Sequence, residues 1–308
     1  MSIATLLDEH SIDLPSYSEV SIESGRAPIT LSVWEAERGT SPTVVFVPGT
    51  MTHPLFYSPF LDALSRHGYH VIGVHPLSHG RSPRVIRRFT LDDMIGNVRD
   101  AVGYACARFP GAVGLMGSSQ GGVLTLLTAG AEHRIRAAFP HNVLFTPLRE
   151  SLSVTRFPNA LGVVYPAIRR IIAAVGRVLP GLQVPVGFYL DVDKVFSEQQ
   201  WRDAFFEDPM RLESYPASFL SSLFTTDMSA LVDGSITCPV VAFVSTGDPL
   251  FTLEYSRLVY ERLAAPEKRL VEVSANHHLI LNEKAEHAMP TVLAALDDYL
   301  KWPALPCG

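Results

Sequence analysis

Short apolar runs alternate with amphipathic segments along most of this chain. Runs of this kind are typical of strands buried on both faces, and they lie at 44–47, 71–74, 113–116, 240–244 and 270–273. The clearest helix between them covers 91–105, with one apolar stripe and Thr90 available as its N-cap. A last helix is predicted from Pro290 to Leu300, since proline suits a first turn. Strands that alternate with helices predict a mostly parallel sheet flanked by helices.

Two segments depart from this alternation. Residues 20–34 alternate apolar and polar positions on both sides of Ser24-Gly25, which predicts an antiparallel hairpin at a sheet edge. Residues 144–236 hold no convincing strand, several prolines, and helix-like pieces near 166–179, 197–206 and 216–226. We interpret this stretch as an inserted helical cap, which divides one core into residues 1–143 and 237–308.

Composition and charge exclude several classes of function. A chain of 308 residues with 47% hydrophobic content is long enough for a large core. Its formal net charge of −6, without a dense Lys/Arg block, makes a nucleic-acid partner a poor hypothesis. No uncharged apolar stretch reaches the roughly 18 residues that a transmembrane helix needs. The oligomeric state is not readable from these features.

The amino terminus and the cysteines favour a cytoplasmic location. The first residues lack a basic region followed by a long apolar run, and Asp8, Glu9 and Asp13 lie where a signal peptide would be apolar. The cysteines are widely spaced, show neither metal-ligand nor redox spacing, and are Cys106, Cys238 and Cys307. We therefore expect no disulfide framework and no metal.

Residues 117–121 carry the clearest chemical signal. They read Gly-Ser-Ser-Gln-Gly, which fits G-x-S-x-G, a sharp strand-to-helix turn that exposes a nucleophilic serine oxygen. The run at 113–116 leads into the turn and an apolar helical pattern follows it. Gly117 and Gly121 are the small positions that such a turn requires. The pattern predicts Ser119 as the nucleophile, against the alternative of a glycine-rich turn without a catalytic role.

A serine nucleophile needs a histidine base and a carboxylate that orients it, following in the order Ser, acid, His. Asp248 comes directly after the strand at 240–244, in Ser-Thr-Gly-Asp-Pro. His277 and His278 come after the strand at 270–273. Asp248 is therefore the predicted acid, and either histidine satisfies the spacing.

These motifs resemble the α/β-hydrolase superfamily over nearly the whole chain apart from the cap. Within it, the sequence is most similar to the monoglyceride lipase and lysophospholipase group of serine esterases. That group's acid motif resembles residues 247–250, and its histidine motif resembles residues 278–283, where a glutamate follows the histidine by five positions. The resemblance selects His278 over His277. It also covers the loop at 75–82, although His75 and Ser78 replace the usual aspartate and glycine.

The oxyanion that forms during acyl transfer needs backbone N–H donors. Gln120, directly after the nucleophile, is expected to supply one, and the loop after the strand at 44–47 the other. By resemblance to the family's H-G-x motif, the second donor is Thr50, with Met51 as the alternative. Pro48 stands where many relatives carry histidine.

Together these features predict a serine hydrolase that cleaves a carboxylic ester with a lipid-like or medium-chain acyl group through an acyl-enzyme, without a cofactor. Residues 161–190 are mostly apolar, so part of the predicted cap is expected either to pack on the core or to line a pocket for an apolar acyl group. The same triad also serves thioester cleavage, acyl transfer and carbon–carbon bond hydrolysis. A rival from another class is a ligand receptor on a silenced hydrolase fold.

Overall fold

A mixed sheet forms the centre of the protein in a computed structural model that describes residues 16–85 and 87–301. Its eight strands are ordered β1 (Tyr17–Ile22), β2 (Ile29–Trp34), β4 (His70–His75), β3 (Thr43–Val47), β5 (Val113–Ser118), β6 (Ile135–His141), β9 (Val240–Ser245) and β10 (Lys268–Val273). β2 pairs antiparallel with β1 and with β4, and all other pairs are parallel. This arrangement confirms the predicted hairpin and the mostly parallel sheet.

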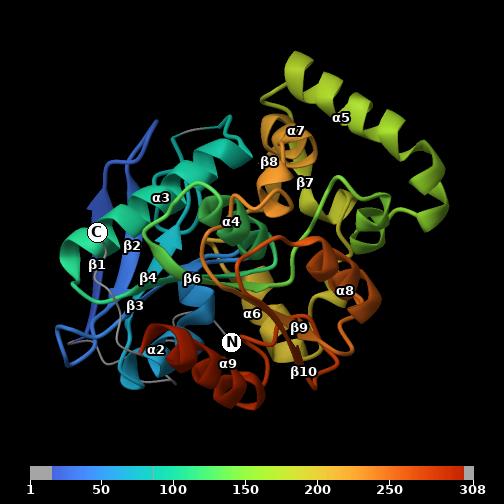
Figure 1. The fold of residues 1–308 in the computed structure, drawn as a ribbon. Helices are drawn as coiled ribbons and strands as arrows, with labels where there is room; N and C mark the ends of the chain where they lie inside the picture. The colour runs from blue at the N-terminus through green and yellow to red at the C-terminus, as the bar shows by residue number, and fades with distance from the viewer. Residues whose placement is uncertain (1–15, 86, 302–308) are drawn as a thin grey trace.

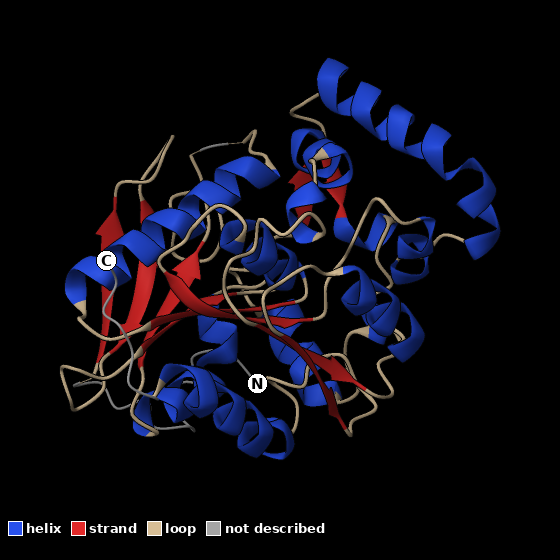
Figure 2. Cartoon of the chain, viewed as in Figure 1, coloured by secondary structure: helices blue, strands red, loops and turns tan. Residues whose placement is uncertain are grey.

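Helices cover both faces of the twisted sheet (Figures 1 and 2). α2 (Ser58–Arg66) and α9 (Ala285–Leu300) contact each other on one face, while α3 (Leu91–Arg108) and α4 (Gln120–Ala129) contact each other on the opposite face. α8 (Leu253–Arg262) connects β9 to β10. Every residue of β3, β4, β5 and β9 is buried, as their continuous apolar runs predict. Because these strands run parallel, their carboxyl ends lie together at one edge of the sheet.

The helix ends test the local predictions. The Thr90 side chain accepts from Asp93 N–H and the Asp93 carboxylate accepts from Thr90 N–H, so α3 begins with a capping box. The predicted start of the last helix at Pro290 was wrong, because α9 begins at Ala285 and contains the proline. A proline this close to a helix start removes one hydrogen bond while later turns continue.

One strand was missed in the sequence. β6 pairs with β5 and with β9, and six of its seven residues are buried. Its sequence contains Arg136 and Pro140, which interrupt the apolar run by which the other strands were predicted.

Residues 142–239, which we call the β6–β9 segment, connect the two halves of the parallel sheet. The predicted helical pieces correspond to α5 (Tyr165–Val178), α6 (Gln199–Glu207) and α7 (Ala217–Thr225). The segment also contains a small antiparallel pair, β7 (Gln183–Pro185) and β8 (Ser214–Pro216), which the sequence did not suggest. α5 packs along α7 and stands away from the sheet (Figure 2). Only Tyr165 and Gly176 of α5 are buried.

The predictions about a signal peptide and about Cys307 concern residues outside those described. Within the described chain, Cys238 is buried and Cys106 is half-buried. None of the described helices combines the length and the apolar composition that a bilayer span requires.

Candidate active site

Ser119 lies on a strained turn between β5 and α4. Its φ of 55° is in the left-handed region, which is uncommon for a residue other than glycine and occurs at strained functional turns. Its N–H donates to His141 O at 2.8 Å, which anchors the turn. A Cβ at Gly117 would lie 2.2 Å from Gly121 O, and one at Gly121 would lie 2.1 Å from Val47 O. The close approach of these backbones explains why both positions are glycine.

Asp248 and His278, from the loops after β9 and β10, are joined in the structure. His278 Nδ1 lies 2.8 Å from Asp248 Oδ2, and both side chains are almost fully buried. Because a carboxylate can only accept, Nδ1 carries the proton and Nε2 is left as the basic nitrogen. Asp248 Oδ1 also accepts from the N–H groups of Leu250 and Phe251. Burial acts to raise the pKa of Asp248, but the His278 ring and these hydrogen bonds lower it below its usual value.

His277 has different partners. Its Nε2 lies 3.0 Å from the backbone carbonyl of Glu283, and its Nδ1 is directed at Asn276 Oδ1. Its ring therefore ties down the loop that precedes α9. The Glu283 carboxylate, fully buried, accepts from Ser197 N–H and Ser197 Oγ in the β6–β9 segment. Glu283, the glutamate of the family motif that selects His278, thus binds that segment to the loop before α9.

The loop after β3, residues 49–52, passes beside the serine. A Cβ built on Gly49 would lie 3.5 Å from Ser119 Cβ. Thr50 Oγ1 donates to Gln120 Oε1 at 3.2 Å, so the structure brings together both predicted oxyanion-hole residues. Gln120 opens α4, where a backbone N–H has no partner within its helix.

Two other N–H groups of this loop donate hydrogen bonds to tyrosine hydroxyls. Gly49 N–H donates to Tyr57 Oη at 3.3 Å, and Met51 N–H donates to Tyr215 Oη at 2.9 Å. Thr52 N–H closes a turn onto Gly49 O. Among the N–H groups of residues 49–52, only that of Thr50 has no acceptor in the described part of the chain. This pattern favours Thr50 over Met51 as a donor to substrate.

Two residues at the end of β6 complete the surroundings of the acid. Asn142 Nδ2 donates to Asp248 Oδ2 at 2.9 Å and lies 3.0 Å from His141 Nε2. The amide must present its nitrogen, because its oxygen would repel the carboxylate. His141 then accepts at Nε2 and donates from Nδ1 to Ser118 Oγ. Burial and the His278 ring lower the pKa of His141 to about 3, so the ring is neutral at pH 7.

Sequence reasoning missed His141 and Asn142 because it missed β6, the strand that ends at His141 and directly precedes Asn142. Asn142 has a φ of 57°, which asparagine tolerates better than most residues. An asparagine directly after a buried strand was the available signal, since the carboxyl ends of parallel strands meet at one sheet edge.

Two small cavities meet at Ser119, and Thr50, Leu190 and Leu250 contribute to both. One, of about 30 Å³, includes His278, and its apolar wall from the β6–β9 segment consists of Leu190, Val192, Val195, Phe196 and Phe205. The other, of about 60 Å³, extends past Gln120 to Leu144, Val154, Tyr189, Phe219, Leu223 and Phe224. Ser119 and His278 thus line one cavity, although no hydrogen bond joins them within the described residues.

Comparison with known proteins identifies the family. Residues 39–285 match the family described as serine aminopeptidase, S33. The chain belongs to this family. It is therefore a serine hydrolase with an α/β-hydrolase fold, as its motifs predict.

Monoacylglycerol lipases are among the relatives of this S33 hydrolase. The chain is 25% identical to a monoacylglycerol lipase of Mycolicibacterium smegmatis, over 90% of this chain and 93% of the relative. The fold is shared with a monoacylglycerol lipase of Paleococcus ferrophilus (TM-score 0.71, 20% identity, 88% of this chain and 99% of the other). It is also shared with a soluble variant of monoglyceride lipase from Saccharomyces cerevisiae (TM-score 0.73, 14% identity, 91% and 95%).

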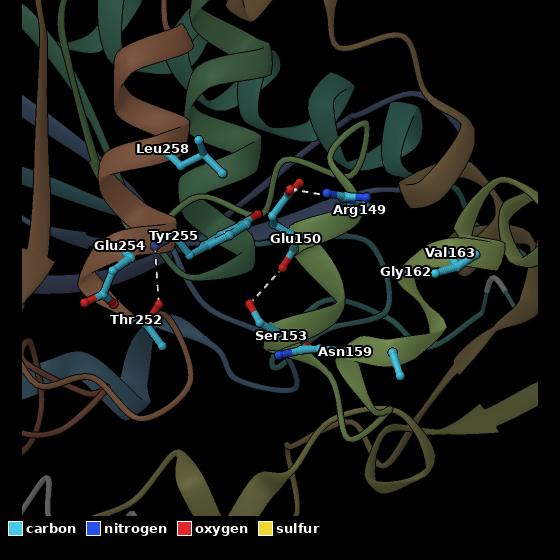
Figure 3. Close-up of a pocket in the computed structure, with 11 residues that line it drawn as sticks. Arg149, Glu150, Ser153, Asn159, Gly162, Val163, Thr252, Glu254, Tyr255 and Leu258 are labelled. Carbon is cyan, nitrogen blue, oxygen red and sulfur yellow. Dashed lines mark hydrogen bonds and ion pairs between the residues drawn. The ribbon is translucent and has the colours of Figure 1, made fainter.

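A wider surface hollow of about 590 Å³ in this S33 hydrolase lies elsewhere, between the start of α8 and residues 149–163 (Figure 3). Three of its polar side chains bond to their own neighbours: Arg149 to Glu150, Ser153 to Glu150 O, and Thr252 to Tyr255 N–H. It contains no serine–histidine pair. The serine and histidine singled out by the sequence instead line one of the smaller cavities, beside Ser119.

Only the end of the apolar stretch at 161–190 lies beside Ser119. Of residues 161–190, Tyr189 and Leu190 reach the cavities beside Ser119. The apolar face of α5 instead remains largely open, with Ile171 62% exposed.

Among residues 16–85 and 87–301, no group of three or more His, Cys, Asp or Glu side chains is arranged to hold a metal ion.

Proposed function

We propose that this S33 hydrolase cleaves a carboxylic ester with an apolar acyl group through a covalent acyl-enzyme. The observation that carries the proposal is the buried hydrogen bond between His278 Nδ1 and Asp248. This bond leaves Nε2 of the His278 ring as the basic nitrogen, and the ring lines the same apolar cavity as Ser119. The names of the lipase relatives support the same substrate class. A silenced receptor has no need of this arrangement.

The reaction follows from the orientation of the side chains. Ser119 Oγ attacks the ester carbonyl carbon while its proton passes to His278 Nε2. The carbonyl oxygen becomes an oxyanion and accepts from the N–H groups of Gln120 and Thr50. Collapse of this adduct expels the alcohol, which takes the proton from His278. Water then attacks the acyl carbon by the same route, which releases the acid and restores the serine.

The two cavities have different access to the base. The leaving alcohol must lie within reach of His278, because it takes its proton from that ring. We therefore assign the cavity that contains His278 to the alcohol, and the cavity that extends past Gln120 to the acyl group. Pockets that enclose drug-sized ligands measure about 300–1,000 Å³, so a cavity of about 60 Å³ suits a short acyl chain. A longer chain needs α7 or residues 189–196 to move.

The cavity walls favour an ester over a peptide with a free amino terminus, despite the family's description. Neither cavity beside Ser119 has an aspartate or glutamate in its wall. A substrate ammonium group placed there would lose its hydration without gaining a counter-charge, which is strongly unfavourable.

We further propose that residues 144–236 act as the cap, between core parts 1–143 and 237–308. The segment supplies most of the apolar cavity wall, and buried side chains such as Tyr215 and Leu231 pack against the core. Limited changes at the cavity wall should therefore alter substrate choice without removing catalysis.

A fluorophosphonate probe and a graded substrate panel test this function. The wild-type protein should be labelled at Ser119 and should hydrolyse carboxylic esters in preference to amino-terminal peptides. Thioesters of matched acyl length test the thioesterase alternative. An alcohol added as acceptor tests the acyl-transfer alternative. A folded protein that refuses the probe and cleaves no ester would refute the proposal.

A further inference from the structure

Residues 49–52, which we call the oxyanion loop, are held by contacts with the β6–β9 segment. Met51 has a φ of 68°, a conformation that a side chain without a local hydrogen-bonding group rarely adopts. Both of its backbone polar groups are bound by that segment: its N–H donates to Tyr215 Oη at 2.9 Å, and its carbonyl accepts from Leu212 N–H at 3.0 Å. The loop conformation therefore depends on residues more than 150 positions away.

The Tyr215 hydroxyl is itself held in a fixed direction. His79 Nδ1 lies 2.9 Å from Leu77 O, so it carries the ring proton and leaves Nε2 as an acceptor. Tyr215 Oη lies 2.9 Å from that Nε2 and donates to it, so its lone pairs face Met51 N–H. Burial lowers the pKa of His79 to about 4, which keeps the ring neutral. Tyr215 is fully buried, and its ring packs against Phe219.

This geometry bears directly on the neighbouring residue. The bond to Tyr215 fixes the peptide plane between Thr50 and Met51, which adjoins the Gly49–Thr50 peptide that carries the Thr50 N–H, and it removes the Met51 N–H from competition for the substrate. Among the four N–H groups of the loop, that of Thr50, beside Gln120, is the one without an acceptor in residues 16–85 and 87–301. We propose that Tyr215 is a positioning residue of the oxyanion hole. Its hydroxyl links the position of the β6–β9 segment to the direction of the Thr50 N–H, an inference that rests on the proposed function.

Tyr215→Phe tests the proposal, and Tyr255→Phe is the matched control. Tyr255 Oη accepts the Phe145 N–H at 2.9 Å in an equally buried setting, away from the oxyanion loop. Each variant removes one hydroxyl that accepts a buried backbone N–H, and Tyr215→Phe also leaves His79 Nε2 without its donor, so Tyr215→Phe should lose more thermal stability than Tyr255→Phe. Only Tyr215→Phe should lower kcat/KM, by about 10- to 100-fold, which is less than the ~100- to 1,000-fold effect of deleting a whole oxyanion donor. The loss should fall on kcat, with KM changed less than threefold.

A trifluoromethyl ketone distinguishes positioning from general loosening. Ser119 Oγ adds to its carbonyl carbon, the serine proton passes to His278, and the resulting alkoxide occupies the oxyanion hole. Its Ki should rise in Tyr215→Phe by the same factor by which kcat/KM falls, and should not change in Tyr255→Phe. Equal losses in the two variants, or a Ki that does not follow kcat/KM, would overturn the proposal.

A second variant covers the case in which Tyr215→Phe does not fold. His79→Phe keeps the tyrosine and the aromatic packing beside Phe89 but removes the acceptor of the hydroxyl proton. It should show the same parallel between Ki and kcat/KM at smaller magnitude, and an unchanged Ki would refute the coupling. Failure of the wild-type protein to cleave any ester would instead refute the proposed function itself.

Discussion

The strand-end loops that carry Ser119 and Asp248 differ from the β6–β9 segment in how they are held. Asp248 accepts from backbone N–H groups two and three residues further on, and the turn at Ser119 is held within the central sheet, by the close approach of Gly121 to Val47 O and by the bond from Ser119 N–H to His141 O. The β6–β9 segment is fixed by partners far away in sequence, through Tyr215 with Met51 and Asp208 with His53. The proposed nucleophile and acid are thus held by the strand ends of the core, whereas the oxyanion loop and cavity walls depend on contacts with the β6–β9 segment.

Burial shows the same difference. Strands β3 and β5, which lead to the oxyanion loop and to Ser119, are buried throughout. In the β6–β9 segment, α5 leaves most of its residues exposed or half-buried, while Tyr215 and Phe219 are buried against the core. Changes in the strand-end loops should therefore abolish the chemistry, and changes in the segment should tune it.

Replacing the proposed nucleophile should have the largest effect. Ser119→Ala removes the attacking oxygen and should lower kcat by about 10⁴-fold or more, with thermal unfolding close to that of the wild type because the hydroxyl contributes little packing. Steady-state kinetics on the best ester of the panel measures this. Residual activity within tenfold of the wild type would show that another residue attacks.

Replacing His278 and replacing His277 should have very different effects on activity. His278→Ala removes the ring bonded to Asp248 and should reduce kcat/KM by several orders of magnitude. His277→Ala loses a bond to the Glu283 carbonyl, so it should lower the melting temperature and reduce activity less than tenfold. The reverse order in a side-by-side assay would assign the base to His277.

Asp248→Asn should reduce kcat by about 10⁴-fold, because an amide permits the wrong imidazole tautomer. The Asp248 pKa lies below its usual value, so the carboxylate stabilises the fold above its unfolded pKa, and this contribution is lost as pH falls through the folded pKa. The variant should lack that part of the acid dependence in unfolding experiments. A near-normal pH–rate profile for Asp248→Asn would indicate a different acid.

His141 should make stability depend on mild acid. Its folded pKa of about 3 lies below its unfolded value near 6.5, so the unfolded state binds the extra proton between these limits and stability falls as pH falls through that window. The free energy of unfolding should drop by about 1.4 kcal/mol per pH unit from this group. Urea unfolding at pH 7 and 5 should show a smaller drop in His141→Gln, and equal drops would mean that the ring is protonated in the fold.

The cavity walls should give the smallest and most selective changes. Each acyl methylene newly buried contributes about 0.8 kcal/mol, or roughly fourfold in kcat/KM. Leu223→Ala should shift the preference toward longer acyl chains, and Val195→Ala should shift the preference among alcohols at constant acyl length. Competition assays with paired esters measure both. An exchange of the two effects would reverse the cavity assignment.

The sequence by itself determined the chemistry-bearing turns. Apolar runs predicted the central strands, glycines at 117 and 121 predicted the elbow, and the order of Ser119, Asp248 and His278 placed them on loops at one sheet edge. These inferences succeed because strand burial and tight turns depend on neighbouring residues. The same reasoning failed for β6, where Arg136 and Pro140 disguise a buried strand, and for the start of α9.

The tertiary structure alone decided how these loops are held. It directed His277 to the Glu283 carbonyl, brought Asn142 to Asp248, and engaged the Met51 N–H with Tyr215. It also placed Leu223 and Phe224, rather than α5, in the cavity wall. Such hydrogen bonds and packing contacts join residues brought together only by folding. Their directions depend on the whole backbone, and they leave no periodic pattern in the chain.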